Sequence, residues 1–372
     1  MTRKSPKIVC FSDVHAHEHR EFASLNPIST RLQECLAGLR WLREEVIPKA
    51  LREASEVTVL FLGDLFHSKR SVSTVVLSEV VKEFGRWPES WPVVHGIPGN
   101  HDIYDANGTH HLLEPLKKGW CLYPSPGVLV TGAGIEVWMI PFRRTADEIR
   151  IALAELHHKH PVKGAGMRIL VLHGILNHAV AGVGARVLPP TIELTEQELA
   201  PFKLVLVGDI HKHQHYERVV YPGALLQHNF GDEGDARGCL VVSCGAGSFT
   251  WEHVPNPTSP AFLTKQIQVL SDLQAPASAT ETTYLHLRLA DPALRPGVEK
   301  WLTKRNAAGY NTCARVTDEP LGQALQVRSG VTLDMSPLAV IERWAQEKGG
   351  DKAEALTELG RQMYEAAVSP ST

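Results

Sequence analysis

The chain has 372 residues, of which 43% are hydrophobic and 21% are charged, and this composition excludes a fibrous or largely disordered protein. The formal net charge of -3 gives no overall basic surface, so binding to nucleic acid would depend on a local patch or on metal ions. The six cysteines form no CxxC pair, and the apolar run near the N-terminus is too short for a signal peptide or a membrane span. We therefore expect a cytoplasmic protein without membrane association, disulfide framework or cysteine zinc site.

Five short runs rich in Val, Ile and Leu predict buried strands, and each run leads directly into a polar motif. The runs are KIVCF, VTVLFL, PVVHGI, RILVL and KLVLV. Segments with helical periodicity lie between them, including residues 31–53. Capping signatures at Thr145 with Glu148 and at Thr195 with Glu198 predict two further helix starts. This alternation predicts an α/β fold.

The pattern changes after the fifth run. RVVYPGAL, RGCLVVSC and SFTWEHV predict consecutive strands of a second, antiparallel sheet or half of a sheet. The chain is rich in Pro, Ser, Thr and Ala around residues 255–279, which favours a boundary near residue 275. We therefore expect a catalytic domain over residues 1–275.

Two smaller parts are predicted beyond that boundary. TYLHLRL, a helix near residues 297–306 and NTCARVT predict a small α+β domain over residues 276–330. Ser336 followed by Pro337, and Asp351 with Glu354, start two helices within a final segment, residues 331–372. Each helix has one apolar face, which would suit either packing against its own domain or docking of a partner.

Metal-ligand side chains follow all five predicted strands. In open α/β sheets, ligands collect beyond the carboxyl ends of the strands, so these side chains should meet at one edge. Carboxylate, imidazole and amide groups without thiolate suit Mn, Fe or Zn in mixed sites. In chain order the motifs supply Asp13 and His15 (SDVH), Asp64 and His67 (GDLFH), Asn100, His101 and Asp102 (GNHD), His173 (LHG), and Asp209 and His211 (GDIHKH).

DxH, GDxxH, GNHD, a later His and a GxxH element, in this order, resemble the calcineurin-like metallophosphoesterase superfamily. The motifs span residues 13–211. GDLFH, and GDIHKHQ followed by YPGAL, are most similar to the SbcD-type nuclease of double-strand-break processing, in its phage or bacterial branch. The resemblance implies a four-layer α/β-β/α sandwich, a DNA exonuclease or endonuclease activity and an SbcC-like ATPase partner with coiled-coil arms. A homodimer is also compatible with it.

The resemblance also implies the metal ligands. Each of the two ions would be held by four residues, and Asp64 would belong to both sets. The first set is Asp13, His15, Asp64 and His211; the second is Asp64, Asn100, His173 and Asp209. The family pattern GHxH has its first His replaced by Asp209 here, and an alternative register would pair His211 with His213 instead. An aspartate in this place would favour Mn²⁺ among the candidate ions, which include Fe, Zn and Mg.

Two ions about 3.5–4 Å apart can clamp the phosphoryl oxygens, so that in-line attack needs no nucleophile from the protein. His101, next to a proposed ligand, would protonate the leaving oxygen, and Asp102 would orient its ring. His67 resembles a second catalytic histidine of the nuclease branch.

Two other functions remain open at this point. A phosphatase or cyclic-nucleotide phosphodiesterase would share the same core, and a scaffold would keep the fold without the metals.

Overall fold

The computed structural model describes residues 4–19, 21–24, 28–69, 71–105, 110–116, 118–161, 167–181, 186–188, 190–273, 282–308, 312–318, 336–348 and 350–368. The predicted α/β class is confirmed, and the five predicted strands are present as β1, β2, β3, β7 and β10. The strands are β1 (Lys7–Phe11), β2 (Val57–Phe61), β3 (Val94–Gly96), β4 (Trp120–Leu122), β5 (Gly127–Val130), β6 (Glu136–Met139), β7 (Arg168–His173), β8 (Val180–Ala181), β9 (Arg186–Val187), β10 (Leu204–Gly208), β11 (Gln214–Tyr216), β12 (Val219–Tyr221), β13 (Gly238–Cys244), β14 (Phe249–Pro255), β15 (Ala261–Ile267), β16 (Thr283–Leu289) and β17 (Thr312–Asp318).

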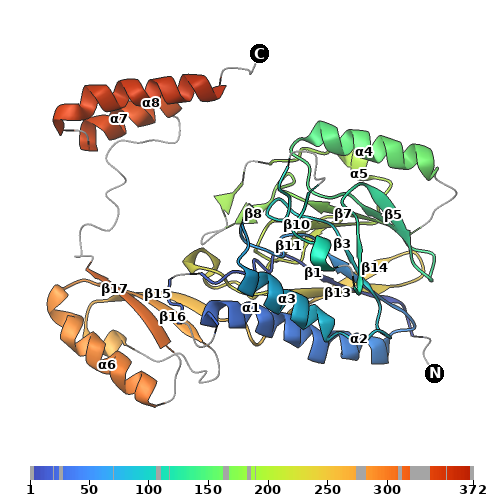
Figure 1. Cartoon of the computed structure of the whole chain (residues 1–372), viewed down its shortest axis with the longest axis horizontal. Helices are drawn as coiled ribbons and strands as arrows, with labels where there is room; N and C mark the ends of the chain where they lie inside the picture. Colours follow the sequence, from blue (N-terminus) through green and yellow to red (C-terminus); the bar gives the residue numbers. More distant parts are fainter. Residues whose placement is uncertain are drawn as a thin grey trace. The chain divides into compact units, whose positions relative to one another are not determined.

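Helices lie between several of these strands along the chain (Figure 1). The α-helices are α1 (Thr30–Trp41), α2 (Ile47–Glu53), α3 (Thr74–Gly85), α4 (Ala146–Lys159), α5 (Glu196–Leu199), α6 (Arg295–Ala307), α7 (Pro337–Lys348) and α8 (Ala353–Val368). The predicted helix over residues 31–53 is interrupted by a π-helical turn, η1 (Leu42–Val46), which separates α1 from α2. Short 3-10 turns are η2 (Glu114–Leu116), η3 (Phe230–Asp232), η4 (Leu270–Asp272), η5 (Pro292–Leu294) and η6 (Gly350–Lys352).

Two six-stranded sheets form the centre of the fold. The first has the order β14-β13-β1-β2-β3-β4, and the second has the order β11-β12-β10-β7-β6-β5. β1, β2, β3 and β4 are parallel to one another, as are β6, β7, β10 and β12. The five strands that carry the motifs are therefore parallel to one another within each sheet. In each sheet their carboxyl ends lie at the same edge.

Three hydrophobic clusters divide the fold into four layers. One cluster lies between the two sheets and takes residues from both, such as Ile8 of β1 and Val171 of β7. A second cluster joins the first sheet to α1, α2 and α3, and a third joins the second sheet to α4 and α5. In Figure 1, α1–α3 and α4–α5 lie on opposite sides of the strands. The four-layer sandwich implied by the resemblance is thus present.

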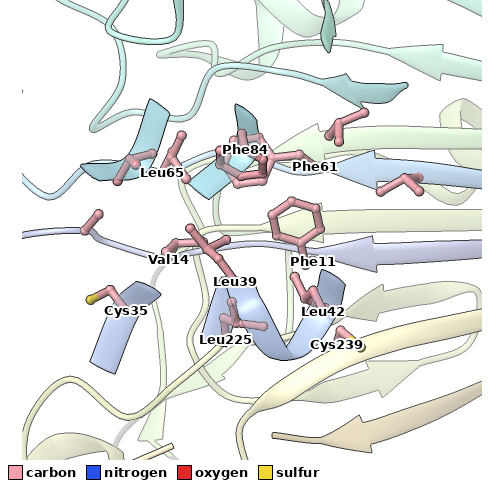
Figure 2. Close-up of a cluster of buried hydrophobic side chains, with 14 of the residues drawn as sticks. Phe11, Val14, Cys35, Leu39, Leu42, Phe61, Leu65, Phe84, Leu225 and Cys239 are labelled. Atoms are coloured by element: carbon pink, nitrogen blue, oxygen red, sulfur yellow. The ribbon is translucent and has the colours of Figure 1, made fainter. Parts of the chain in front are cut away.

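Strand β1 shows how the sequence produces this layering. Side chains alternate between the two faces of a strand, so Val9 and Phe11 join the helix-covered cluster while Ile8 and Cys10 face the other sheet. Phe11 packs against Phe61 of β2, with ring centroids 5.1 Å apart, and Leu39 and Leu42 of the neighbouring helices close over them (Figure 2). A strand buried on both faces has no polar positions, which is why its sequence is a continuous apolar run.

The three strands predicted after the fifth motif are present as β12, β13 and β14, but they do not form a separate sheet. β13 pairs with β1 and β14 pairs with β13, both antiparallel, so these strands extend the first sheet. β12 instead pairs in parallel with β10 of the second sheet. The three strands therefore divide between the two central sheets.

The C-terminal third contains a three-stranded sheet of order β15-β16-β17, with α6 between β16 and β17. A separate compact unit consists of residues 289–294 and 318–372, and in its described part α7 packs against α8. The boundaries expected between residues 275 and 276 and between residues 330 and 331 lie outside the described residues. Within the described part of the chain, no helix is both long and apolar enough to span a membrane.

Candidate metal centre

The loops after β1 and β2 run together at the edge of the first sheet. Asp13 N donates to the Gly63 carbonyl at 3.0 Å, and His15 N donates to the Asp64 carbonyl at 3.1 Å. These backbone bonds continue the parallel pairing of β1 and β2 beyond Phe11. They bring the side chains of Asp13, His15 and Asp64 into one buried site.

The second sheet supplies ligands to the same place. β7 and β10 end in register, with Gly208 opposite His173. His173 Nε2 lies 3.4 Å from Asp64 Oδ1 and 3.8 Å from Asp209 Oδ1, so His173 stands between carboxylates from both sheets. His15 Nε2 lies 3.6 Å from Asp64 Oδ2, on the other oxygen of the same carboxylate.

Among the residues that the structure describes, three overlapping groups of side chains could hold metal ions, and in each group the ligand atoms lie within 4.8 Å of one another. Asp13 and His15 each belong to two of the groups. The groups are Asp13, His15 and His211; Asp13, Asp64 and His173; and His15, His67 and His101. The structure therefore gathers side chains that are as many as 198 residues apart in the chain, from Asp13 to His211.

Backbone strain is concentrated at this site. Asp13, His15, Asp64 and Asp209 have φ values of 51°, 46°, 62° and 95°, in the left-handed region that non-glycine residues rarely occupy. Each such conformation costs about 1–3 kcal/mol and persists only where the surroundings enforce it. Strain at four polar strand-end residues is typical of a functional site.

Gly63 explains why a glycine precedes Asp64. Its φ is +102°, and a Cβ atom there would lie 2.5 Å from His173 Nδ1. The close approach lets the loop after β2 pass beside the imidazole from the other sheet. The His173 Nδ1 atom lies 2.6 Å from the Leu62 carbonyl oxygen, which leaves Nε2 directed at the carboxylates.

The negative charge of the carboxylates at this site favours binding of a cation. Burial alone would lower the pKa of His173, but Asp64, Asp209 and Asp13 outweigh it and raise the pKa from 6.5 to about 10. Burial and the charge of Asp64 raise the pKa of Asp13 to about 6. The Asp13 and Asp64 carboxylates are buried and that of Asp209 is partly buried, so positive charge between the three stabilises them.

The donor set fits divalent metal ions. Among the described residues, Asn100 Oδ1 and His173 Nε2 are buried atoms without a hydrogen-bond partner, although buried polar atoms are normally paired. Carboxylate, imidazole and amide donors together suit Mn²⁺, Fe or Zn²⁺. The predicted ligands Asp13, His15, Asp64, Asn100, His173, Asp209 and His211 are among the residues that could hold them, and His67 and His101 lie beside these ligands.

Metal affinity should increase with pH. The His173 pKa of about 10 means that below this pH a metal ion must displace a proton from Nε2. Release of one proton makes affinity rise about tenfold per pH unit, and below pH 6 the protonation of Asp13 adds to the dependence. Isothermal titration with Mn²⁺ at pH 6.5, 7.5 and 8.5 measures this slope, and an affinity independent of pH would contradict it.

His67 and His101 lie together on one side of the candidate ligands. Their rings are 5.6 Å apart and nearly stacked, and the His15 ring lies 4.9 Å from that of His101. His101 Nδ1 lies 2.5 Å from the His67 carbonyl oxygen. This contact holds the ring by one nitrogen and leaves Nε2 to interact with a bound substrate.

The expectation that Asp102 orients the His101 ring is wrong. The Asp102 carboxylate is fully buried and accepts hydrogen bonds from four backbone N–H groups instead. They belong to Asp64, Leu65, Phe66 and Gly99, at 2.7–3.2 Å. Asp102 therefore connects the loop after β2 to the loop after β3. The group that contacts His101 Nδ1 is the His67 carbonyl and not the Asp102 carboxylate.

Replacing Asp102 with alanine should lower the free energy of unfolding by at least about 3 kcal/mol. Several buried N–H groups would lose their acceptor, and each unsatisfied group costs about 1–3 kcal/mol. Chemical denaturation measures the change. Asp147→Ala removes an exposed carboxylate on α4 and should change stability by less than about 0.5 kcal/mol. Equal stability of the two variants would refute this role for Asp102.

His213 lies apart from the candidate ligands. Its Nδ1 contacts the Tyr221 carbonyl oxygen at 2.8 Å, and its ring stacks on His253 with centroids 4.3 Å apart. His228, Asp232 and Arg237 were not found by the sequence reasoning, although they surround His211. No motif marks them, since each is a single residue in the segment between YPGAL and β13.

A sequence model described as calcineurin-like phosphoesterase matches residues 6–192 of the chain. The matched region contains β1, β2, β3 and β7 with their motifs, and ends before Asp209 and His211.

Proposed function

The chain belongs to the calcineurin-like phosphoesterase family, and on this premise we propose that it is a two-metal phosphodiesterase that cleaves DNA. We further propose that it resembles the SbcD-type exonuclease or endonuclease subunit, in the phage or bacterial branch, and acts in DNA repair or recombination in the cytoplasm. The observation that carries the proposal is the meeting of five strand-end motifs from two sheets at one buried site, with His67 and His101 beside it.

The ligands divide between two ions in the proposed arrangement. Asp64 is shared because its two carboxylate oxygens face different imidazoles, those of His15 and His173. Asp209 contributes to the His173 side, where its carboxylate already lies. The position of His213 supports the register with Asp209 and His211 rather than His211 and His213. The carboxylate of Asp209, in place of the histidine of the family pattern, favours Mn²⁺.

When bound, the divalent ions supply Lewis-acid activation of the phosphoester and of the attacking water. The remaining chemistry is assigned to residues of the chain. His101 Nδ1 donates to the His67 carbonyl, so Nε2 is the ring nitrogen that faces the reaction. Its Nε2 then holds the proton that the leaving oxygen takes. The nearby His67 side chain gives a second imidazole on the substrate side.

The preference for DNA rests on the nuclease-like motifs. GDLFH supplies His67, and YPGAL follows GDIHKHQ. In the structure this second segment supports the site, since Ala224 N donates to the His211 carbonyl at 2.9 Å. Both motifs therefore belong to the site or its immediate support rather than to distant surface loops.

The partner that we propose is an SbcC-like ATPase with coiled-coil arms. In the C-terminal unit, α7 and α8 pack together but leave Trp344, Leu359 and Met363 51%, 54% and 66% exposed. Amphipathic helices with a free apolar face commonly dock onto helical partners. If the protein co-purifies with an ATPase and Trp344→Glu abolishes this co-purification, the assignment is supported. Unchanged co-purification of Trp344→Glu would show that these helices are not the binding site for the ATPase.

A panel of three substrates tests the proposed activity. Linear duplex DNA, bis-p-nitrophenyl phosphate and p-nitrophenyl phosphate are incubated with the protein in Mn²⁺. We expect cleavage of DNA and of the diester, with little turnover of the monoester. Monoester turnover without DNA cleavage would favour a phosphatase, turnover of the small diester alone would favour a cyclic-nucleotide phosphodiesterase, and no turnover at all would favour a scaffold.

A further inference from the structure

Asp232 is a buried carboxylate beside the candidate metal centre that the proposed reaction has not used. It lies at the end of η3, after the region matched by the family model, and its side chain is 8% exposed. Asp232 Oδ1 lies 3.5 Å from His211 Nδ1 and 2.8 Å from Arg237 Nη2. Asp232 Oδ2 accepts a hydrogen bond from His228 N at 2.8 Å. Both oxygens of the Asp232 carboxylate therefore have partners, Oδ1 with His211 and Arg237 and Oδ2 with His228 N.

Arg237 holds this arrangement from the other side. Its side chain is 1% exposed, and its guanidinium donates to the His211 carbonyl as well as pairing with Asp232. One cation thus contacts both the backbone of His211 and the carboxylate that faces the His211 ring. Because guanidinium groups are planar and rigid, this double contact fixes the carboxylate in place.

The turn that carries Asp232 is itself ordered by local hydrogen bonds. Asn229 Oδ1 accepts from Gly231 N at 2.7 Å, and the Asn229 carbonyl accepts from Asp232 N at 3.0 Å. A carboxylate fixed opposite Nδ1 favours the His211 tautomer with the proton on that nitrogen.

We propose that Asp232, clamped by Arg237, is the positioning residue that holds the His211 imidazole with Nε2 free to bind a divalent cation. This inference rests on the proposed function, because it takes His211 as a metal ligand. Histidine ligands commonly donate their second ring N–H to a carboxylate, and loss of that partner typically lowers metal affinity about 10–100-fold.

Asp235 provides a matched control for Asp232. It is three residues away, carries the same charge and also pairs with Arg237, at 3.6 Å, and with Lys212, at 2.9 Å. Its contacts differ in that Asp232 faces the His211 ring. An effect of Asp232 that Asp235 does not share therefore comes from the contacts that Asp232 makes, with the His211 ring, with His228 N and at close range with Arg237, and not from the loss of a negative charge at this place.

Mn²⁺ binding to the full chain tests the proposal. Isothermal titration compares the wild type, Asp232→Asn and Asp235→Asn, and melting temperatures in EDTA report the folding of each metal-free protein. An asparagine cannot satisfy both the Arg237 side and His228 N, so the carboxylate geometry is lost. We expect Asp232→Asn to weaken Mn²⁺ binding about 10–100-fold and Asp235→Asn to leave it within about twofold of wild type.

The Mn²⁺ dependence of DNA cleavage gives a second readout. Half-maximal activity should require a higher Mn²⁺ concentration in Asp232→Asn, while the rate at saturating Mn²⁺ recovers most of the wild-type value. If Asp232→Asn does not fold, Arg237→Lys keeps the charge but loses the double contact, and it should weaken Mn²⁺ binding in the same direction.

The outcomes separate this inference from the function on which it rests. Mn²⁺ binding by the wild type with equal affinity in Asp232→Asn and Asp235→Asn would overturn the positioning role alone. A wild type that binds no Mn²⁺ would overturn both the positioning role and the proposed metal centre.

Discussion

Replacing Asp64 with asparagine should reduce Mn²⁺-dependent cleavage of DNA by at least about 10³-fold, the upper range for loss of one preorganised electrostatic group. The carboxylate is 1% exposed and its two oxygens face His15 and His173, so no other group can take over both sides. The amide keeps the shape of the side chain but loses its charge and one acceptor. Initial rates of nucleotide release measure the effect.

Asp235→Asn is the control for this prediction, since it removes an equal charge near the site from a residue that pairs with Lys212 and Arg237. Its rate should stay close to that of the wild type. Mn²⁺ stoichiometry should fall in Asp64→Asn and remain unchanged in the control. Activity of Asp64→Asn near the wild-type level would exclude a shared ligand at this position.

Replacing His101 with alanine should lower the rate of cleavage by about 10²–10⁴-fold, the contribution of a positioned general acid. The ring is held by the His67 carbonyl through Nδ1, so its loss removes the proton donor without removing a proposed metal ligand. Mn²⁺ affinity should therefore change little. Steady-state rates and Mn²⁺ titrations on the same preparation separate the two effects.

His213→Ala is the control for His101, because it removes another histidine that lies apart from the candidate ligands and stacks on His253. It should retain activity. A DNA substrate with a leaving group that needs no protonation should also rescue much of the activity of His101→Ala. Wild-type turnover by His101→Ala with its metals bound would refute the role of general acid.

The central strands could be predicted from the sequence because parallel strands buried on both faces are continuous apolar runs, such as residues 169–172. The candidate ligands could be predicted because parallel strands place their carboxyl-end motifs at a common edge. Both signals are local. Each needs only the residues of one strand and of the loop that follows it.

The parts that were missed depend on contacts between distant segments. Nothing in the sequence of β12, β13 and β14 says whether they pair with each other, with β1 or with β10. Asp102 appeared to be a partner for its neighbour His101, whereas its four hydrogen bonds come from the loops after β2 and β3. Asp232 meets His211 across 21 residues, and no spacing rule connects them.

A crystal of the full chain soaked in Mn²⁺, with anomalous differences measured, tests the central claim most directly. We predict two peaks: one contacted by Asp13, His15, Asp64 and His211, and another contacted by Asp64, Asn100, His173 and Asp209. A single peak, or peaks held by His213 in place of Asp209, would contradict the two-metal site described here.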